Sequence, residues 1–271
     1  MGKIKIVWIC HLSNAQVRAK LKFKKLTPLS ILRRLRGQVD LSDFAIWNTN
    51  AILEFEKFKD VELHIIAPYY NIGGIQEFEI NSIHYHFFEP EDDNLISIIK
   101  SKVQKKIKTS YNKNSKVINA LILKVKPDIV HLIGAENPYY GESVLTLSHK
   151  APLIISLQTL MREPNFYKNY PITKELYDYR ASIEAKIIKR ADYIGSKVEV
   201  FRKIIKESIH PSARFLDMNL ALGEKVTITK VDKLYDFVYF AADISKAVDY
   251  AIEGFAIAKK SFPNITLHVV G

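Results

Sequence analysis

Polar side chains stand in or just after several short apolar segments of this sequence. Those able to exchange hydrogen bonds with ligand hydroxyl groups are Ser13, Asn14, His131, Glu136, Asn137, Gln158 and Thr159. Asn219 follows a later apolar segment in the same way. Ligands of open parallel sheets bind beyond the carboxyl ends of the strands. If the apolar segments are parallel strands, these residues share one edge of a sheet and form a binding site there.

Each of these candidates also has a purely structural interpretation, and the sequence leaves both open. His131 lies inside an apolar segment, where a buried core histidine fits the pattern equally well. Glu136 precedes a predicted helix, whose positive N-terminal end favours a carboxylate without any ligand. Gln158 also fits an ordinary loop. Ser196 and Glu199 form a capping-box pattern that explains this serine fully, and no residue is assigned a catalytic role.

Short apolar segments alternate with helical patterns along most of the chain. Predicted strands cover 3–10, 61–67, 76–80, 83–88, 128–133, 153–157, 193–195 and 214–218, and predicted helices cover 40–58, 138–150, 174–190 and 196–206. In the helix 138–150, Asn137 is the expected N-cap and Pro138 the first helical residue. The alternation predicts an α/β fold, with a Rossmann-like, mostly parallel sheet and helices on both faces.

The end of the chain repeats this alternation only once. A strand at 236–240, a helix at 245–262 and a strand at 266–270 form one βαβ unit, after a polar stretch at 224–233. A two-stranded sheet has too little core to be stable alone. We therefore expect an N-terminal domain over 1–225, followed by a linker and the first βαβ unit of an incomplete second Rossmann-like domain over 226–271.

Composition excludes several classes of protein. The chain has 271 residues, of which 48% are hydrophobic and 25% charged, so it is not a disordered protein. A single cysteine, Cys10, excludes a disulfide framework and a CxxC metal or redox pair. The acidic run at 89–93 has no spaced histidine and is interpreted as a solvated surface, so no metal site is predicted. With no membrane span or secretory signal in the sequence, we expect a cytoplasmic protein.

The positive charge is concentrated in two segments. Lysine and arginine number 40 against 29 acidic residues, a formal net charge of +11. The segments 18–36 and 100–126 contain no acid, and the basic residues of the first are Arg18, Lys20, Lys22, Lys24, Lys25, Arg33, Arg34 and Arg36. Leucines between them suit a segment lying on an anionic membrane, which would place the protein at the inner face of the membrane. The alternative is a helix that packs its leucines on the core.

Several motifs occur in the order and spacing of one enzyme family. They are PDIVHLIG at 127–134, KRADYIGS at 189–196, YFAADISKAVDYAIEGF at 239–255, FPN at 262–264 and LHVVG at 267–271. Together they resemble the GT-B glycosyltransferases of retaining family 4, covering mainly the N-terminal acceptor domain and the start of the donor domain. The resemblance is better from residue 127 onward than over 15–60.

The resemblance implies a retaining glycosyltransferase that moves a sugar from a UDP- or GDP-linked donor to a glycan or lipid-linked acceptor, in cell-surface polysaccharide synthesis. The seven polar residues named first would contact the acceptor, and Asn219 and Lys246 the donor. Cationic side chains and helix N-termini would stabilise the diphosphate, so no cofactor or metal is expected. The sequence departs from the family in having Gln158 where a histidine is common and no arginine at 242–243, and the family's paired glutamates would lie beyond Gly271.

Two other classes of function remain open at this stage. The missing arginine and the incomplete second domain are also consistent with a non-catalytic sugar- or nucleotide-binding module. The basic segments are consistent with nucleic-acid binding, which needs aromatic stacking platforms or a recognition helix. The segment 100–126 offers only Tyr111 as an aromatic platform, so no nucleic-acid partner is expected.

Overall fold

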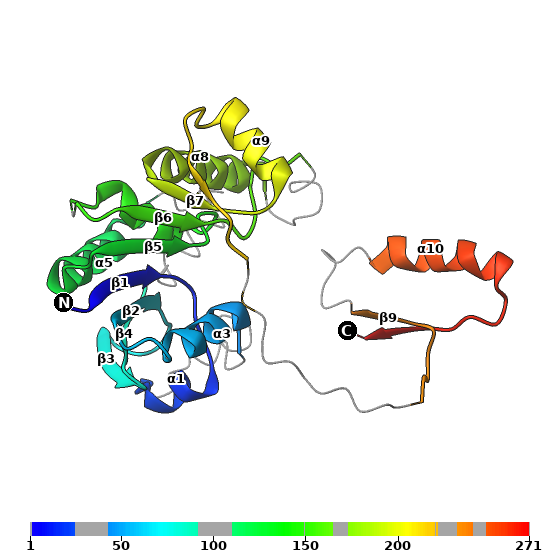
Figure 1. Cartoon of the computed structure of the whole chain (residues 1–271), viewed down its shortest axis with the longest axis horizontal. Coiled ribbons are helices and arrows are strands. Elements are labelled where there is room, and N and C mark those ends of the chain that lie inside the picture. The colour runs from blue at the N-terminus through cyan, green and yellow to red at the C-terminus, as the bar shows by residue number, and fades with distance from the viewer. Residues whose placement is uncertain are drawn as a thin grey trace, which may run out of the picture. The chain divides into compact units, whose positions relative to one another are not determined.

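A computed structural model describes residues 2–24, 43–91, 110–148, 150–164, 173–219, 221, 232–240 and 248–270 (Figure 1). The chain divides into two compact units. The first covers 1–163 and 173–223, and the second has its secondary structure in 232–240 and 248–270. Lys25, Arg33, Arg34, Arg36 and Lys246 lie outside the described residues.

The first unit is built on one eight-stranded sheet with strand order β3-β4-β2-β1-β5-β6-β7-β8. Its strands are β1 (Ile4–Ile9), β2 (Val61–Pro68), β3 (Ile75–Ile80), β4 (Ile83–Phe88), β5 (Ile129–Ile133), β6 (Leu153–Ser156), β7 (Tyr193–Gly195) and β8 (Phe215–Leu216). Every neighbouring pair is parallel except β3 with β4, which form an antiparallel hairpin at the edge. The prediction of a Rossmann-like, mostly parallel α/β sheet is confirmed.

Helices cover both faces of this sheet. They are α1 (Ala15–Lys20), α3 (Ile46–Phe55), α5 (Asn112–Val125), α6 (Pro138–Gly141), the 3₁₀ helix η1 (Glu142–Thr146), α8 (Lys174–Arg190) and α9 (Glu199–Ser208). Side chains of α5, α8 and α9 share one core cluster, and those of α1 and α3 share another. In Figure 1, α8 and α9 lie near β7, and α1 and α3 lie near the β2–β4 end of the sheet.

The two cores follow from the two-residue period of a strand. In β1, Val7 and Ile9 belong to the core on the α5 side, while Trp8 and the following Cys10 belong to the core on the α3 side. All four are at most 4% exposed. Successive side chains of a strand point to opposite faces, so a strand covered on both sides must be apolar throughout. This is the pattern that the segment 3–10 shows.

Two predicted helices differ from the structure in their bounds, and one expected cap is missing. The helix predicted over 40–58 is α3, which starts at Ile46 after Ala45 adopts a left-handed conformation with φ 52°. Pro138 opens a helix as expected, but α6 ends at Gly141 and continues as η1. Asn137 makes no side-chain cap there, because its Oδ1, the atom that would accept from the helix, accepts from Arg180 instead.

The predicted capping box at Ser196 is also wrong. Helix α9 begins at Glu199, and Val198 is its N-cap without a side-chain hydrogen bond. Ser196 Oγ accepts from the backbone N–H of Val198 at 3.2 Å, and its carbonyl accepts from Arg202 Nε at 2.8 Å. Arg202 also forms an ion pair with Asp217. Ser196 is therefore a turn residue before the helix, held by an arginine from within it.

The second unit contains β9 (Phe237–Phe240), α10 (Val248–Ser261) and β10 (Leu267–Val270). The two strands pair in parallel, with Phe237 opposite Leu267, which confirms the βαβ connection. None of the described side chains of α10 is buried. The division of the first unit from the second falls at Gly223, and the interpretation of 226–271 as the start of a larger domain stays a prediction.

No helix among the described residues is both long enough and apolar enough to cross a membrane.

Candidate functional site

A cavity of about 330 Å³ lies toward the carboxyl ends of five neighbouring strands of the first unit. Its lining residues come from β1, α3, β5 and the ends of β6, β7 and β8: Trp8, Trp47, Asn48, Ala51, Phe55, His131, Ile133, Ser156, Leu157, Gln158, Gly195, Ser196, Lys197, Val198, Met218, Asn219 and Ala221. Open parallel sheets bind ligands at this edge. We refer to it below as the carboxyl-edge cavity.

Polar groups at the floor of the cavity are joined to one another. His131 Nε2 lies 2.8 Å from Ser156 Oγ, which also contacts Met218 Sδ at 3.7 Å. Burial lowers the pKa of His131 to about 4, so its ring is neutral near pH 7. A Cβ at Gly195 would lie only 2.5 Å from Met218 Sδ. The absence of a side chain at Gly195 therefore lets the segment after β8 approach the strand ends.

Aromatic rings form the wall on the α3 side. The Trp8 ring contacts Phe55 at a centroid distance of 5.0 Å and His131 at 5.7 Å, both edge-on. The indole nitrogen of Trp47 is buried and has no hydrogen-bond partner among the described residues. A buried N–H without a partner is costly, and a ligand oxygen in this cavity would give it an acceptor. Both tryptophans of the chain line the cavity.

The loop after β5 forms a second polar group at the same edge of the sheet. Gly134 has φ 91°, and a Cβ there would lie 2.6 Å from the Tyr140 hydroxyl oxygen. That hydroxyl donates to the Ile133 carbonyl at 2.9 Å. Asn137 Nδ2 donates to Glu136 Oε1 at 2.9 Å and to the Tyr140 hydroxyl at 3.1 Å. A glycine is needed here for both backbone conformation and space.

Two buried carboxylates from different elements are held near this loop. Arg180 of α8 donates from Nε to the Glu136 carbonyl at 2.8 Å and from a terminal nitrogen to Asn137 Oδ1 at 3.2 Å. Glu184, one turn further along α8, accepts from the Met161 N–H at 2.9 Å. Burial raises the pKa of Glu136 to about 7 and the pKa of Glu184 to about 8, and the charge of Glu136 adds to the rise at Glu184.

Each of these carboxyl groups has one oxygen without a hydrogen bond. Glu136 Oε2 and Glu184 Oε1 are buried and have no partner within the described parts of the chain. Glu136 is 7% exposed and Glu184 is fully buried. Since Glu136 and Asn137 do not line the carboxyl-edge cavity, their observed contacts are with the protein itself.

The side chains of Ser13 and Asn14, which follow β1, also form hydrogen bonds within the protein. Asn14 Oδ1 accepts from the Val17 N–H at 2.9 Å and caps α1. Ser13 Oγ accepts from Arg18 at 2.9 Å and lies 3.2 Å from the Tyr69 hydroxyl. Both residues stand at the carboxyl edge, as their position after β1 predicts, but neither lines the cavity.

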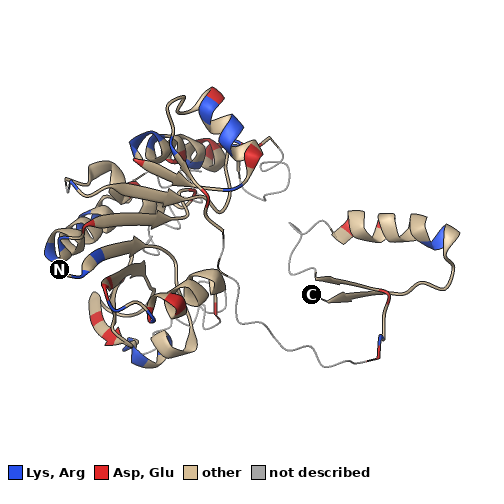
Figure 2. Ribbon diagram, viewed as in Figure 1, with Lys and Arg blue, Asp and Glu red and all other residues tan. Residues whose placement is uncertain are grey.

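Two of the basic residues of 18–36 that lie in the described part form ion pairs. Arg18 contacts Asp43 at 2.7 Å, and Lys24 contacts Glu89 at 2.5 Å. Lys20 and Lys22 have exposed side chains. Figure 2 shows the described lysines and arginines spread over the helices, with acidic residues between them. The described residues therefore do not form one uniformly basic face, and the rest of both basic segments lies outside them.

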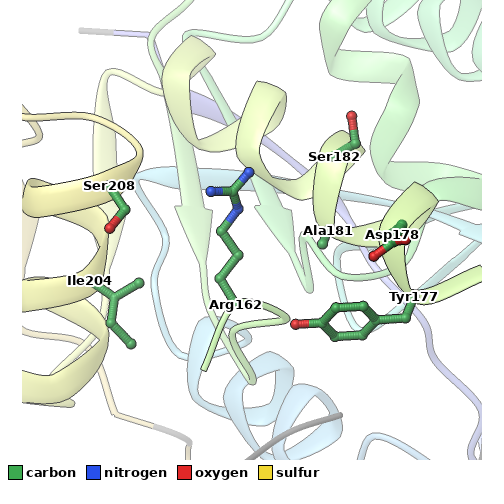
Figure 3. A pocket seen from close by; sticks show the side chains of 7 residues that line it. All are labelled: Arg162, Tyr177, Asp178, Ala181, Ser182, Ile204 and Ser208. Atoms are coloured by element: carbon green, nitrogen blue, oxygen red, sulfur yellow. The ribbon is translucent and has the colours of Figure 1, made fainter. Parts of the chain in front are cut away.

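A second cavity, of about 410 Å³, lies between α8 and α9 (Figure 3). Figure 3 shows Arg162 between Ile204 and Ser208 of α9 on one side and Tyr177 and Asp178 of α8 on the other. Its lining sets one arginine opposite an acid and several hydroxyl groups, and no strand end contributes to it. We therefore place the candidate site at the carboxyl-edge cavity.

The structure brings together part of the set that the sequence predicts. His131, Gln158 and Asn219, from three different strands or strand ends, line one cavity. Thr159 follows Gln158, and its buried hydroxyl has no partner among the described residues. The aromatic wall of Trp8 and Trp47 was not predicted. Trp47 lies within the helix predicted over 40–58 and belongs to α3, but a helical pattern does not show that the helix leaves a space against the sheet.

His11 is a further residue that sequence reasoning missed. Its ring nitrogens lie 2.6 and 2.9 Å from the Tyr139 hydroxyl, and its ring packs on Phe44 at a centroid distance of 4.6 Å. Asn48 donates to its backbone carbonyl at 2.9 Å. His11 thus joins the loop after β1 to α3 and α6. Its position directly after a predicted strand was the available signal.

Comparisons with protein-family models and with curated proteins found no match. Among solved structures, the chain is similar to a sucrose-phosphate synthase from Thermosynechococcus elongatus, with 10% identity, a TM-score of 0.48 and coverage of 99% of this chain and 71% of that one. A putative UDP-N-acetylglucosamine 2-epimerase from Listeria monocytogenes has 14% identity and a TM-score of 0.48, covering 99% and 63%. A UDP-forming α,α-trehalose-phosphate synthase from Burkholderia vietnamiensis has 8% identity and a TM-score of 0.41, covering 77% and 43%. The chain thus spans less than two thirds of the second and third of these proteins.

Proposed function

We propose that this chain is the acceptor-binding part of a retaining glycosyltransferase, which moves a sugar from a UDP- or GDP-linked donor to a glycan or lipid-linked acceptor in cell-surface polysaccharide synthesis. The observation that carries the proposal is the carboxyl-edge cavity. The cavity is lined by the side-chain amides of Gln158, after β6, and Asn219, after β8, and by the two indole rings. The sequence motifs that resemble the GT-B glycosyltransferases are the second support.

The chemistry of the lining suits a hydroxyl-rich ligand. Gln158 and Asn219 each offer an amide donor and a carbonyl acceptor, which match the two roles of a hydroxyl group. Mostly apolar walls with a few placed polar groups are typical of small-molecule sites. The neutral ring of His131, held by Ser156, is suited to orienting a hydroxyl group and not to carrying charge. Donor binding through Asn219 and Lys246 belongs to the same proposal, with no cofactor or metal required.

A fluorescence titration tests ligand binding in the cavity. Because both tryptophans line it, UDP-sugars, GDP-sugars and glycan oligosaccharides that enter should change the intrinsic emission. Gln158→Ala removes one polar contact, worth about 0.5–1.5 kcal/mol, so we expect about a 2- to 12-fold weaker dissociation constant. Gln16→Ala, an exposed glutamine of α1 outside the cavity, is the matched control and should bind as wild type.

A transfer assay separates an enzyme from a binding module. The product of the complete reading frame is incubated with membranes and with UDP- or GDP-sugars labelled in the sugar. Transfer of label into glycan or lipid-linked material, reduced by Gln158→Ala, supports the proposal. Binding in the fluorescence titration without any transfer would instead favour the non-catalytic sugar-binding module.

The same proposal places the protein at an anionic membrane surface through the segment 18–36. Among the described residues of this segment, the exposed Lys20 and Lys22 would contact the membrane. Each basic residue near such a surface contributes about 1 kcal/mol to binding. Co-sedimentation with anionic liposomes should decrease in the double variant Lys20→Gln/Lys22→Gln. Lys203→Gln/Lys206→Gln on α9 is the control. Equal sedimentation of both variants would contradict this part of the proposal.

A further inference from the structure

Histidine and glutamate side chains gather on three strands at the β3 edge of the sheet, and none of them lines the carboxyl-edge cavity. The members of this group, called the histidine cluster below, are Glu62 and His64 on β2, His84 and His86 on β4, and Glu77 and Glu79 on β3. Strand register places His64 opposite His84, and Glu79 opposite His84 on its other side. Residues two apart on a strand share a face, so the six side chains lie on one face.

Hydrogen bonds link four of these side chains in a row. His86 Nδ1 lies 2.6 Å from Glu77 Oε1, and His86 Nε2 lies 3.0 Å from His64 Nδ1. His64 Nε2 in turn lies 2.9 Å from Glu62 Oε1. Lys124 Nζ of α5 donates to the other carboxyl oxygen of Glu77 at 2.6 Å. The row therefore runs from a carboxylate through two imidazoles to a second carboxylate.

This row has one hydrogen bond more than it has protons. A neutral imidazole carries one N–H and a carboxylate carries none. Two imidazole rings with one N–H each therefore supply two protons for the three contacts of the row. If the N–H at His86 Nδ1 donates a hydrogen bond to Glu77, then His86 Nε2 accepts a hydrogen bond from the N–H at His64 Nδ1. The lone pair of His64 Nε2 then faces the Glu62 carboxylate at 2.9 Å, and a cation bound between the two would relieve their repulsion.

We propose that Glu62, His64 and His84 bind a divalent metal ion of the zinc type. One ligand atom from each of the three side chains lies within 4.8 Å of the others. Two imidazoles and one carboxylate form a common zinc ligand set, with bonds of about 2.0–2.2 Å and a fourth position left for water. Ligands of such an ion are about 3.3 Å apart, so Glu62 and His64 are already close to the required separation.

Neighbouring side chains hold the proposed ligands in the orientation that metal binding needs. A metal-bound histidine usually donates its second ring N–H to an outer partner that fixes its orientation. His86 is that partner for His64, and Glu77 with Lys124 holds His86. The His84 ring stacks on His64 at a centroid distance of 4.6 Å, and its side chain is 36% exposed. His84 can therefore turn toward the ion, and solvent gives the ion a path to the site.

The charges on the strands and helix that face this site favour a cation. Glu62, Glu77 and Glu79 carry three negative charges. Lys5, 3.2 Å from Glu62, and Lys124, 2.6 Å from Glu77, carry two positive charges. The three carboxylates and the two lysines together contribute a net charge of −1 before any metal binds. One divalent ion at the Glu62 end also removes the repulsion between its carboxylate and His64 Nε2.

Calorimetric titration of the whole protein with ZnCl₂ near neutral pH tests the proposal. We expect one ion per chain with saturable binding. His84→Ala removes a partly exposed ligand and should weaken the affinity by at least about tenfold. His210→Ala removes a histidine outside the cluster and should leave the affinity unchanged. Equal binding by wild type and His84→Ala would overturn the assignment.

Glu77→Gln tests the outer partner separately from the ligands. It keeps the shape of the side chain but weakens the acceptor that holds His86, so we expect the zinc affinity to fall by about 10- to 100-fold. Zinc should also raise the Tm of wild type, and EDTA should reverse the rise. Both effects should be smaller in His84→Ala at the same zinc concentration, which keeps the comparison valid if that variant is slightly less stable.

X-ray absorption of the zinc-loaded protein identifies the ligands. Two imidazole rings and oxygen donors at about 2.0–2.1 Å are expected. If wild type takes up no zinc, and NMR shows His64 as an imidazolium near pH 7, a proton occupies the position and the metal proposal is overturned. These measurements do not depend on sugar transfer, so their outcome is independent of the proposed function.

Discussion

The loop after β5 concentrates the most constrained residues of the first unit. Gly134, with φ 91°, allows the Tyr140 hydroxyl to reach the Ile133 carbonyl. Behind this turn, Arg180 holds the backbone of Glu136, and Glu184 holds the N–H of Met161. Two carboxyl groups with raised pKa values are thereby buried beside the edge of the sheet where ligands of this fold class bind. Single substitutions can separate the contributions of conformation, space and charge.

Gly134→Ala should destabilise the protein by about 2–4 kcal/mol. A left-handed φ costs a non-glycine residue about 1 kcal/mol, and the new Cβ would lie 2.6 Å from the Tyr140 hydroxyl. Gly74→Ala is the control, because Gly74 has φ 96° but no atom lies within 4 Å of the place that a Cβ would occupy. Urea unfolding of both variants measures the difference. Equal losses would show that the contact with Tyr140 is unimportant.

Glu184→Gln should make stability less dependent on pH. The pKa of Glu184 is about 8 in the folded protein and about 4.3 unfolded, so the folded state binds the extra proton between these values. Its contribution to stability is complete below pH 4.3 and is lost as pH rises to about 8. Glutamine does not titrate and still accepts from the Met161 N–H.

Unfolding free energies of wild type and Glu184→Gln, measured from pH 5 to pH 8.5, check this expectation. At the upper end the variant should be the more stable by at least about 1 kcal/mol. Glu175→Gln, on an exposed position of the same helix, should follow the wild-type profile. Parallel profiles for Glu184→Gln and wild type would mean that Glu184 is ionised in the folded protein at neutral pH.

At the scale of elements, the ends of helices and hairpins decide where side chains are presented. Asn81 and Ser82 both have positive φ, 51° and 67°, so the β3–β4 hairpin closes through a two-residue turn of the type favoured by strand twist. This turn fixes the register that places Glu79 opposite His84. The loop between α5 and β5 begins in a similar way, because Lys126 has φ 53°. A lysine here occupies a conformation that favours glycine.

Lys126→Gly should stabilise the protein by about 0.5–1 kcal/mol. Glycine adopts the left-handed conformation without the steric cost that a lysine has, and the backbone bond from residue 126 to the Ile122 carbonyl is retained. Lys116→Gly, at an exposed position inside α5, should instead cost about 1 kcal/mol. Chemical unfolding measures both, and a loss of stability in Lys126→Gly would contradict the interpretation of this helix end.

At the scale of the whole molecule, the two units differ in their cores. The first unit has two hydrophobic clusters, one on each face of its eight-stranded sheet. In the second, the described residues of α10 include no buried side chain, and Phe240, Tyr250, Ile257 and Phe262 are 64–73% exposed. A parallel strand pair with one helix does not bury enough apolar surface to be stable by itself.

Residues 1–223 should therefore unfold with the same midpoint as the whole chain. Thermal unfolding followed by circular dichroism should give one cooperative transition for this fragment, within about 2 °C of the full chain. Residues 224–271 alone should show no cooperative transition. A cooperative transition in that short fragment would show that the second unit has an independent core.

The sequence by itself determined the layer structure of the first unit. Segments such as 3–10 and 128–133 are apolar at almost every position, a pattern that only strands covered on both faces require, and their alternation with helices indicates parallel order. It also placed Gln158 and Asn219 at strand ends, because the end of an apolar run is visible in the chain. The side-chain caps expected of Asn137 and Ser196 do not form, because Asn137 Oδ1 accepts from Arg180 and Ser196 Oγ accepts from the Val198 N–H in a turn before the helix.

Only the tertiary structure decided which of these residues meet. The gap between α3 and the sheet, through which Trp47, His131 and Gln158 line one cavity, depends on how a helix packs and leaves no periodic trace in the sequence. The pairing of His64 with His84 depends on the register of two strands separated along the chain by β3. Spacing along a chain fixes which face a side chain occupies, whereas distances between faces are fixed by packing.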